Sequence, residues 1–287
     1  MKNLKIKISA VVFAAFLVVF ATGAKKNSKV VETAYPKSIV ALSPSAAEVL
    51  FAVGAGDQVS AVSEYTDYPA EAAAKPVVGG FDGKTLSIET IMSYKPDLVY
   101  LTEGMHNFLI STLESNGIAY YISKGESIAS VEQEILDVGK LTGHEKEAKK
   151  VVDGMEKKLK KVAKKAGTPV KVYYEVWNAP YMSVGTTSFI NDVIVKAGGE
   201  NIFGDLTDAY PMVSEESIIS REPAAIIIPA SSGLEPSAVG LRNGWSDIPA
   251  VKNCKVFVVD DNVYTRPGPR IADVVVELSE RLSGQAR

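Results

Sequence analysis

Cysteine and histidine are nearly absent from this sequence. Among 287 residues, Cys254 is the single cysteine, and His106 and His144 are the two histidines. An internal disulfide is therefore impossible, and a His-rich zinc or manganese site lacks its ligands. A Ser-His-Asp triad is also disfavoured, because His144 opens a long helical pattern. These absences exclude several common classes of enzyme.

Signatures of nucleotide and nucleic-acid binding are missing as well. The chain has no Gly-x-Gly-x-x-Gly and no phosphate-binding loop of the Walker type, and its net charge is -3 without a basic stripe. We therefore expect no nucleic-acid partner.

Arginine is absent before Arg221. A trianionic catecholate chelate would favour several guanidinium groups, so few arginines among many aromatics suit a large, nearly neutral ligand.

The only long apolar run lies at the N-terminus. Three lysines precede Ile8–Phe20, an apolar run broken only by Ser9, and small residues end at Ala24. This run is short for a membrane span, so residues 1–24 are predicted to be a signal peptide and residues 25–36 a linker. An uncleaved anchor helix is the alternative. Ala24 stands where exported lipoproteins carry a lipidated cysteine, so we expect a periplasmic or extracytoplasmic protein without that anchor.

Two stretches of the chain repeat each other 127 residues apart. Residues 87–99 align without a gap on residues 214–226, with five identical positions among thirteen. In each copy a helix-capping serine is followed by a glutamate in the first turn, then by a proline that ends the helix and a β-rich run. This pattern predicts two similar lobes. The alternative is a chance match between two common helix-to-strand junctions.

A long amphipathic helix is expected between the two copies. From His144 to Ala166, apolar residues recur every three or four positions and lysines cover the other face, until Gly167 and Pro169 end the pattern. A single helix joining two lobes is stiff, which predicts little lobe motion on ligand binding. The expected organisation is a first lobe at 37–142, an interlobe helix at 143–167 and a second lobe at 168–287.

Strand-like and helical segments alternate within each lobe, which predicts Rossmann-like α/β lobes with mostly parallel sheets. Ligands of such sheets bind beyond the carboxyl ends of the strands. Aromatic residues gather in the loops that follow these strands. Each one alone is equally explained by packing within its loop, but the set favours a shared cleft. The candidates are Tyr65, Phe81, Trp177, Tyr181, Tyr210 and Tyr264, with Arg266 beside the last.

Two polar residues in post-strand loops are weaker candidates. Ser45 lies in the turn at 42–48, where it is expected to cap a helix and help present backbone amides to a ligand. His106 follows the strand-like run at 97–101. A solvent-exposed position is the favoured reading for His106, and an axial metal ligand reaching the cleft is the alternative.

Several motifs together resemble the cobalamin-binding periplasmic proteins and their relatives that bind iron–siderophore complexes or haem. The resemblance runs from about Pro36 to Leu282 and implies a class III periplasmic binding protein, with two lobes joined by one rigid helix. Residues 65–69 and 175–180 are more similar to the cobalamin branch. The motifs that carry the resemblance are residues 43–48, 65–69, 198–203 and 266–270 and the two serine–glutamate repeats.

The resemblance implies a substrate-binding protein of an ABC importer, monomeric, without enzymatic activity or a cofactor of its own. Its ligand is expected to be a cobalt corrinoid, with an iron chelate or haem as the alternative. Family members line the cleft with aromatics equivalent to Tyr65, Phe81, Trp177 or Tyr181, and Tyr210, while Tyr264 and Arg266 close it. Phe81 and Tyr210 stand where the best-known members have Trp, which leaves the ligand open.

The resemblance also implies a partner, the two-fold permease dimer. Glu89 and Glu216 would each engage arginines on one permease subunit, although the helix dipole alone also accounts for a glutamate there. Two other classes of protein fit the sequence less well. A metal-cluster enzyme with nitrogenase-like lobes needs several cysteines and has one, and a purely structural or adhesive module would lack an aromatic cleft.

Overall fold

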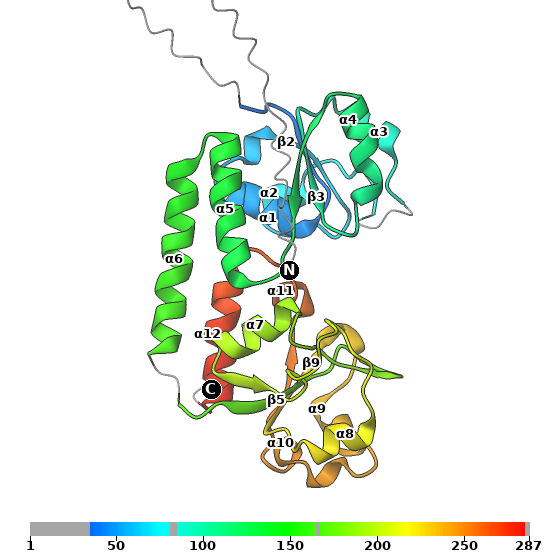
Figure 1. Ribbon diagram of the computed structural model, residues 1–287, viewed down its shortest axis with the longest axis vertical. Helices are drawn as coiled ribbons and strands as arrows, with labels where there is room; N and C mark the ends of the chain where they lie inside the picture. The colour runs from blue at the N-terminus through cyan, green and yellow to red at the C-terminus, as the bar shows by residue number, and fades with distance from the viewer. Residues whose placement is uncertain (1–34, 81–84, 165–166, 285–287) are drawn as a thin grey trace, which may run out of the picture.

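The structure, a computed structural model, describes residues 35–80, 85–164 and 167–284. The predicted signal peptide, all but the last two residues of the predicted linker, and Phe81 lie outside these residues. Two α/β lobes lie one beyond the other alongside a pair of long helices (Figure 1). Within the described residues, no helix has the length and apolar character needed to cross a membrane.

Each lobe is built on a four-stranded sheet in which every pair of neighbours is parallel. Counted in chain order within each sheet, both follow the strand order 2-1-3-4. The first sheet has the order β2-β1-β3-β4 and the second β10-β9-β5-β8. Their strands are β1 (Ile39–Ala41), β2 (Val59–Val62), β3 (Leu98–Thr102), β4 (Ala119–Ser123), β5 (Val170–Tyr174), β8 (Gly199–Asn201), β9 (Ala225–Pro229) and β10 (Val256–Val259).

The sequence repeat corresponds to one structural unit used twice. Helices α3 (Ile88–Ser93) and α8 (Glu215–Ser220) are each capped by the serine that precedes them. After each helix, one residue adopts a left-handed conformation, Lys95 with φ 48° and Glu222 with φ 50°, before the proline that prevents further helix. The strands that follow, β3 and β9, are each third in chain order in their sheet, which confirms the two similar lobes.

A helical hairpin joins the lobes. Helix α5 (Ile128–Thr142) ends at Gly143, whose φ of 82° favours glycine, and α6 (Glu145–Ala163) runs back along it. In the view of Figure 1, α6 extends from the level of the first lobe to that of the second, where α12 (Ile271–Leu282) lies beside it. The buried residues of α6 follow the predicted apolar stripe: Ala148, Val152, Met155 and Val162.

The hydrophobic core is continuous between the lobes. One buried cluster includes Ile39 and Tyr100 of the first lobe, Met155 of α6, and Val172 and Val275 of the second. Two smaller clusters lie on the other faces of the two sheets. Because interiors are close-packed, a shared core resists displacement of one lobe against the other.

Short elements complete the chain. Two strands form a separate antiparallel hairpin, β6 (Trp177–Asn178) and β7 (Tyr181–Met182). The remaining helices are α1 (Pro44–Ala52), α2 (Ala70–Ala73), α4 (Ile110–Ser115), α7 (Phe189–Lys196), α9 (Pro236–Gly240), α10 (Pro249–Lys252) and α11 (Asp261–Tyr264), with single 3₁₀ turns at Gly56–Gln58, Asn107–Leu109, Ala230–Ser232 and Trp245–Asp247.

Candidate ligand-binding site

Loops from the carboxyl ends of both sheets meet between the lobes. Arg266, after β10, forms an ion pair with Asp67, after β2, and its Nη2 donates to the Tyr65 carbonyl at 3.1 Å. Gly125, after β4, approaches Pro267 so closely that a Cβ there would lie 2.9 Å from the Pro267 ring. Parallel α/β sheets bind ligands at these ends of their strands, so the site is expected here.

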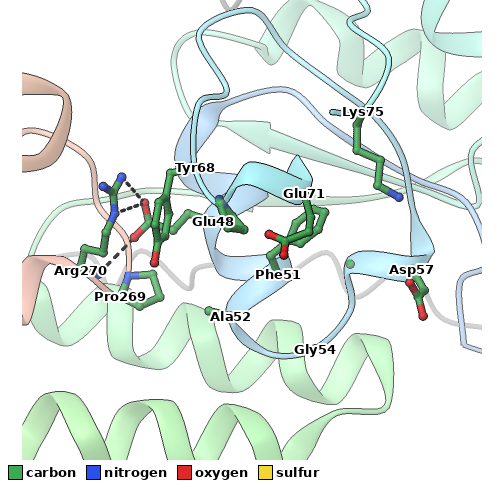
Figure 2. A pocket seen from close by; sticks show the side chains of 12 residues that line it. Glu48, Phe51, Ala52, Gly54, Asp57, Tyr68, Glu71, Lys75, Pro269 and Arg270 are labelled. Carbon is green, nitrogen blue, oxygen red and sulfur yellow. Dashed lines mark hydrogen bonds and ion pairs between the residues drawn. The ribbon is translucent and has the colours of Figure 1, made fainter. Parts of the chain in front are cut away.

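A second ion pair crosses the same interface. The Arg270 guanidinium donates to Glu48 Oε2 from Nε at 3.0 Å and from Nη2 at 2.8 Å, and it lies 4.0 Å from the centroid of the Tyr68 ring. Figure 2 shows this pair at the edge of a pocket of about 600 Å³ beside α1 and α2. The described members of the predicted ligand set do not line this pocket. This pocket is therefore distinct from the predicted ligand site on the aromatic loops.

Strand register gives the second lobe one exposed apolar face. Trp177 pairs with Met182 across the β6–β7 hairpin, and Met182 pairs with Met212 on its other side. Directly paired residues project from the same face of a sheet, so these three side chains share one face. Trp177 is 59% exposed and Met212 is 70% exposed. We call these three residues the Trp177 face.

Tyr181 lies on the opposite face of the hairpin, because it pairs with Asn178. Its ring lies 5.6 Å from that of Trp245, which is fully buried, and its hydroxyl donates to Glu215 at 3.2 Å. Trp245 Nε1 donates to the same Glu215 oxygen at 2.8 Å. The Tyr181 ring therefore packs on the second lobe's own core and does not share the Trp177 face, so its contact with a ligand stays a prediction.

Tyr264 is also placed differently from the expectation. It ends the short helix α11, which Asp260 caps, and it is 3% exposed within the core cluster that contains α12. A ring buried there does not close an open cleft. Arg266 does reach the lobe interface, but its guanidinium is engaged by Asp67 and the Tyr65 carbonyl. Direct contact between Arg266 and a ligand therefore remains a prediction.

The positions of Ser45 and His106 also differ from those expected. Ser43, not Ser45, caps α1: its hydroxyl accepts from the Ala46 amide at 3.2 Å because Pro44 occupies the first turn. Ser45 is buried, with its hydroxyl 3.1 Å from that of Ser43. His106 is fully buried and its Nδ1 accepts the Thr102 amide at 2.9 Å. It is therefore neither an exposed loop residue nor placed to reach a ligand in the cleft.

Tyr65 and Tyr210 keep the exposure that a ligand contact requires. Tyr65 is 67% exposed and Tyr210 is half exposed. Tyr210 precedes Pro211, whose carbonyl accepts the Ser183 amide at 3.0 Å, so it lies next to the β6–β7 hairpin. Tyr65, Tyr210 and the Trp177 face are the described candidates that the fold leaves accessible.

A buried ion pair that the sequence did not predict lies directly before the hairpin. Glu175 is 1% exposed and binds Arg242 through both carboxylate oxygens, at 2.5 and 2.8 Å. The Arg242 guanidinium lies 4.6 Å from the Trp245 ring centroid and 5.4 Å from that of Tyr181. Glu175 precedes Trp177 by two residues, so the pair anchors the hairpin at its base. No local sequence pattern links residues 67 positions apart.

Helices α3 and α8 lie one in each lobe (Figure 1). Glu89 and Glu216 are exposed and occupy equivalent positions in the first turns of these helices. The Ser87 hydroxyl donates to Glu89 at 2.7 Å and lowers the pKa of Glu89 below its usual 4.5. Its own backbone amide and the Ser214 hydroxyl lower the pKa of Glu216 likewise. Both carboxylates are therefore ionised at neutral pH.

Across the described ranges, there is no cluster of three or more His, Cys, Asp or Glu side chains arranged to hold a metal ion. The accessible surfaces are aromatic and thioether side chains, which suit contact with a flat organic ring.

Comparisons with known proteins identify the family. Residues 39–263 match the family described as periplasmic binding protein. The chain is 33% identical over 257 residues to YvrC of Bacillus subtilis (strain 168), an uncharacterized ABC transporter substrate-binding lipoprotein, covering 86% of this chain and 80% of that one. Other relatives are named vitamin B12-binding or cobalamin-binding proteins.

Two solved structures share the fold over nearly their full lengths. The periplasmic vitamin B12-binding protein of Vibrio cholerae is 25% identical, with a TM-score of 0.76 and coverage of 87% of this chain and 98% of that one. A possible iron-binding, periplasmic solute-binding protein of Staphylococcus epidermidis is 30% identical, with a TM-score of 0.75 and coverage of 86% and 99%. The chain therefore belongs to the periplasmic binding protein family, as a class III substrate-binding protein of an ABC transporter and not an enzyme.

Proposed function

We propose that this protein captures a corrinoid between its lobes and delivers it to the permease of an ABC importer. The observation that carries the proposal is the Trp177 face, an exposed indole flanked by two thioethers at the carboxyl end of β5. The Trp177 indole donates to the Ala179 carbonyl at 3.0 Å, which fixes the ring plane. A fixed, exposed ring is suited to stack on a large flat ligand.

The charges between the lobes support a ligand with little net charge. Arg266 and Arg270 are each paired with a carboxylate of the first lobe, Asp67 and Glu48. A polyanionic chelate would favour guanidinium groups with available donors. The relatives named for vitamin B12 or cobalamin add support. The resemblance of residues 65–69 and 175–180 to that branch, noted from the sequence, points the same way.

An iron chelate or haem is the second candidate. The Staphylococcus epidermidis protein named as possibly iron-binding matches the fold as well as the vitamin B12-binding protein does, with TM-scores of 0.75 and 0.76. Fold similarity therefore does not choose between the ligands. Tyr65 favours this candidate, because haem iron accepts a tyrosine phenolate and this ring is exposed.

Titration with cyanocobalamin and with haemin tests the proposal. Cyanocobalamin is expected to quench Trp177 fluorescence at about micromolar concentration or below. Trp177→Ala and Phe81→Ala should each weaken binding by about 1–3 kcal/mol, the scale of a buried aromatic contact. A Soret shift with haemin and no response to cyanocobalamin would replace corrinoid by haem. Unchanged affinity in both variants would remove this cleft from the proposal.

A further inference from the structure

Arg266 is held at the lobe interface by acceptors from both lobes. Its guanidinium pairs with Asp67, donates to the Tyr65 carbonyl at 3.1 Å and donates to Asn262 Oδ1 at 3.2 Å. The Arg266 side chain is only 12% exposed. A guanidinium has five N–H donors in a fixed fork, and these bonds use much of that capacity. Arg266 is therefore built into the interface with the first lobe.

Tyr65 has a backbone conformation that needs such support. Its φ of 60° is in the left-handed region, which costs a residue with a side chain roughly 1–2 kcal/mol. Two bonds hold the backbone around it: the Glu64 amide donates to the Gly79 carbonyl at 2.8 Å, and Arg266 binds the Tyr65 carbonyl. Unusual backbone conformations of this kind persist where surrounding contacts over-determine them, and they concentrate at ligand sites.

The Asp67 carboxylate completes this support. Its bond to Arg266 lowers the pKa of Asp67 below its usual 3.8, so the pair is charged on both sides at neutral pH. Asp67 and Tyr65 belong to one short turn, and Arg266 binds both the Asp67 carboxylate and the Tyr65 carbonyl. One side chain of the second lobe thereby fixes the turn that presents an exposed tyrosine of the first lobe.

We infer that Arg266 is a positioning residue, which holds the Tyr65 turn in its ligand-ready conformation from across the lobe interface instead of contacting the ligand itself. The inference rests on the proposed function, because it takes the Tyr65 ring to contact the ligand. Without Arg266 the turn would leave the left-handed conformation for part of the time. Apparent affinity falls in proportion to the fraction of molecules in the competent conformation.

Hydrogen exchange tests the positioning without any ligand. In the ligand-free protein, Arg266→Ala should raise the exchange rate of the Glu64 amide about tenfold, because the turn opens locally. Arg221→Ala is the matched control. It removes another arginine–aspartate pair, Arg221–Asp205, that lies wholly within the second lobe, and should leave that amide unchanged. Equal exchange in Arg266→Ala and the wild type would overturn the positioning role, whatever the protein binds.

A double-mutant cycle tests the route to affinity, with cyanocobalamin and haemin as probes. Arg266→Ala is expected to weaken binding about tenfold, and Asp67→Ala should do the same. Arg266→Ala combined with Tyr65→Ala should bind no more weakly than Tyr65→Ala alone, because Arg266 acts through Tyr65. If the double variant instead lost affinity by the product of the two single losses, the inference would be overturned and Arg266 would contact the ligand directly.

The two experiments separate the possible failures. If Glu64 exchange rises in Arg266→Ala but the wild type binds neither probe, the proposed function fails. The effect of Arg266 on ligand affinity then fails with it, while its effect on the turn stands. If the wild type binds a probe and Arg266→Ala binds equally well, the proposed function stands and the inference fails. Thermal unfolding of each variant confirms that the compared proteins are folded.

Discussion

At the scale of single residues, the least predictable features are two buried glutamates, each of which binds an arginine far away in the sequence. Glu175 binds Arg242 at the base of the β6–β7 hairpin, and Glu48 binds Arg270 across the lobe interface. Both glutamate side chains are nearly inaccessible to solvent. Since a buried charge is tolerated only with a partner, each pair fixes two distant segments relative to each other.

Removing Arg242 should therefore destabilise the second lobe. Arg242→Ala leaves the Glu175 carboxylate buried without its counter-charge, which is expected to cost about 3–5 kcal/mol of unfolding free energy. Lys149→Ala is the control, because its partner Asp153 is exposed and the pair should be worth less than about 1 kcal/mol. Urea unfolding followed by circular dichroism measures both. Similar losses in the two variants would mean that the buried pair stabilises no more than a surface one.

At the scale of elements, a two-residue turn decides which side chains face the cleft. Trp177 and Tyr181 are four residues apart and would share a face on one continuous strand. The turn at Ala179 and Pro180 instead pairs Trp177 with Met182 and Asn178 with Tyr181. A hairpin's register cannot be read from spacing alone, because a shift of one residue exchanges the two faces. Met182 and Met212 therefore share the face of Trp177, where the sequence had predicted Tyr181.

The register makes a specific prediction for Met212. Met212→Ala should weaken cyanocobalamin binding by about 1 kcal/mol, the scale of a thioether contact with a flat ring. Tyr181→Phe is the control: it should leave affinity unchanged and cost about 0.5–1.5 kcal/mol of stability through its lost bond to Glu215. Isothermal titration and urea unfolding together measure these effects. A larger loss of affinity in Tyr181→Phe than in Met212→Ala would contradict the assignment of faces.

The repeated helices α3 and α8 make a prediction about the permease. Glu89→Ala combined with Glu216→Ala should leave cyanocobalamin affinity intact but weaken docking and transport, because the two carboxylates match a two-fold partner. Docking should also weaken as salt rises. Protonation removes the charge, and the pKa of each glutamate lies below 4.5, so docking should survive acidification to that pH and fail only below it.

Glu145→Ala is the matched control for this experiment. Glu145 also lies in the first turn of a helix, α6, but outside the repeat. Reconstituted transport, measured beside ligand titration, gives the comparison. Normal transport by the double variant, or loss of ligand binding instead, would leave Glu89 and Glu216 as helix-dipole or cleft residues only.

At the scale of the whole molecule, three features oppose lobe motion. The core cluster is continuous from Ile39 in the first lobe to Val275 in the second. Helix α6 packs on both α5 and α12, and Lys158 of α6 binds Asp273 of α12 at 2.5 Å. The pairs of Arg266 and Arg270 with the first lobe add to this. We therefore expect closure on ligand to be limited to loops and side chains.

Small-angle X-ray scattering tests this stiffness. The radius of gyration should be nearly the same with and without a saturating concentration of cyanocobalamin, because a shared core does not deform continuously. The ligand-free protein measured at several concentrations provides the control against association. A clear compaction on binding would favour a hinge between the lobes over the rigid arrangement.

The sequence by itself determined the two-lobe α/β plan, the repeated helix–proline–strand unit and the apolar stripe of α6. These depend on local periodicity, capping serines and prolines, which act over a few residues. Only the tertiary structure decided that Tyr264 and His106 are buried and that Trp177 shares its face with Met212. It also brought Arg266 to Tyr65, 201 residues apart. Burial, register and long-range ion pairs are properties of the packed chain, and no local pattern encodes them.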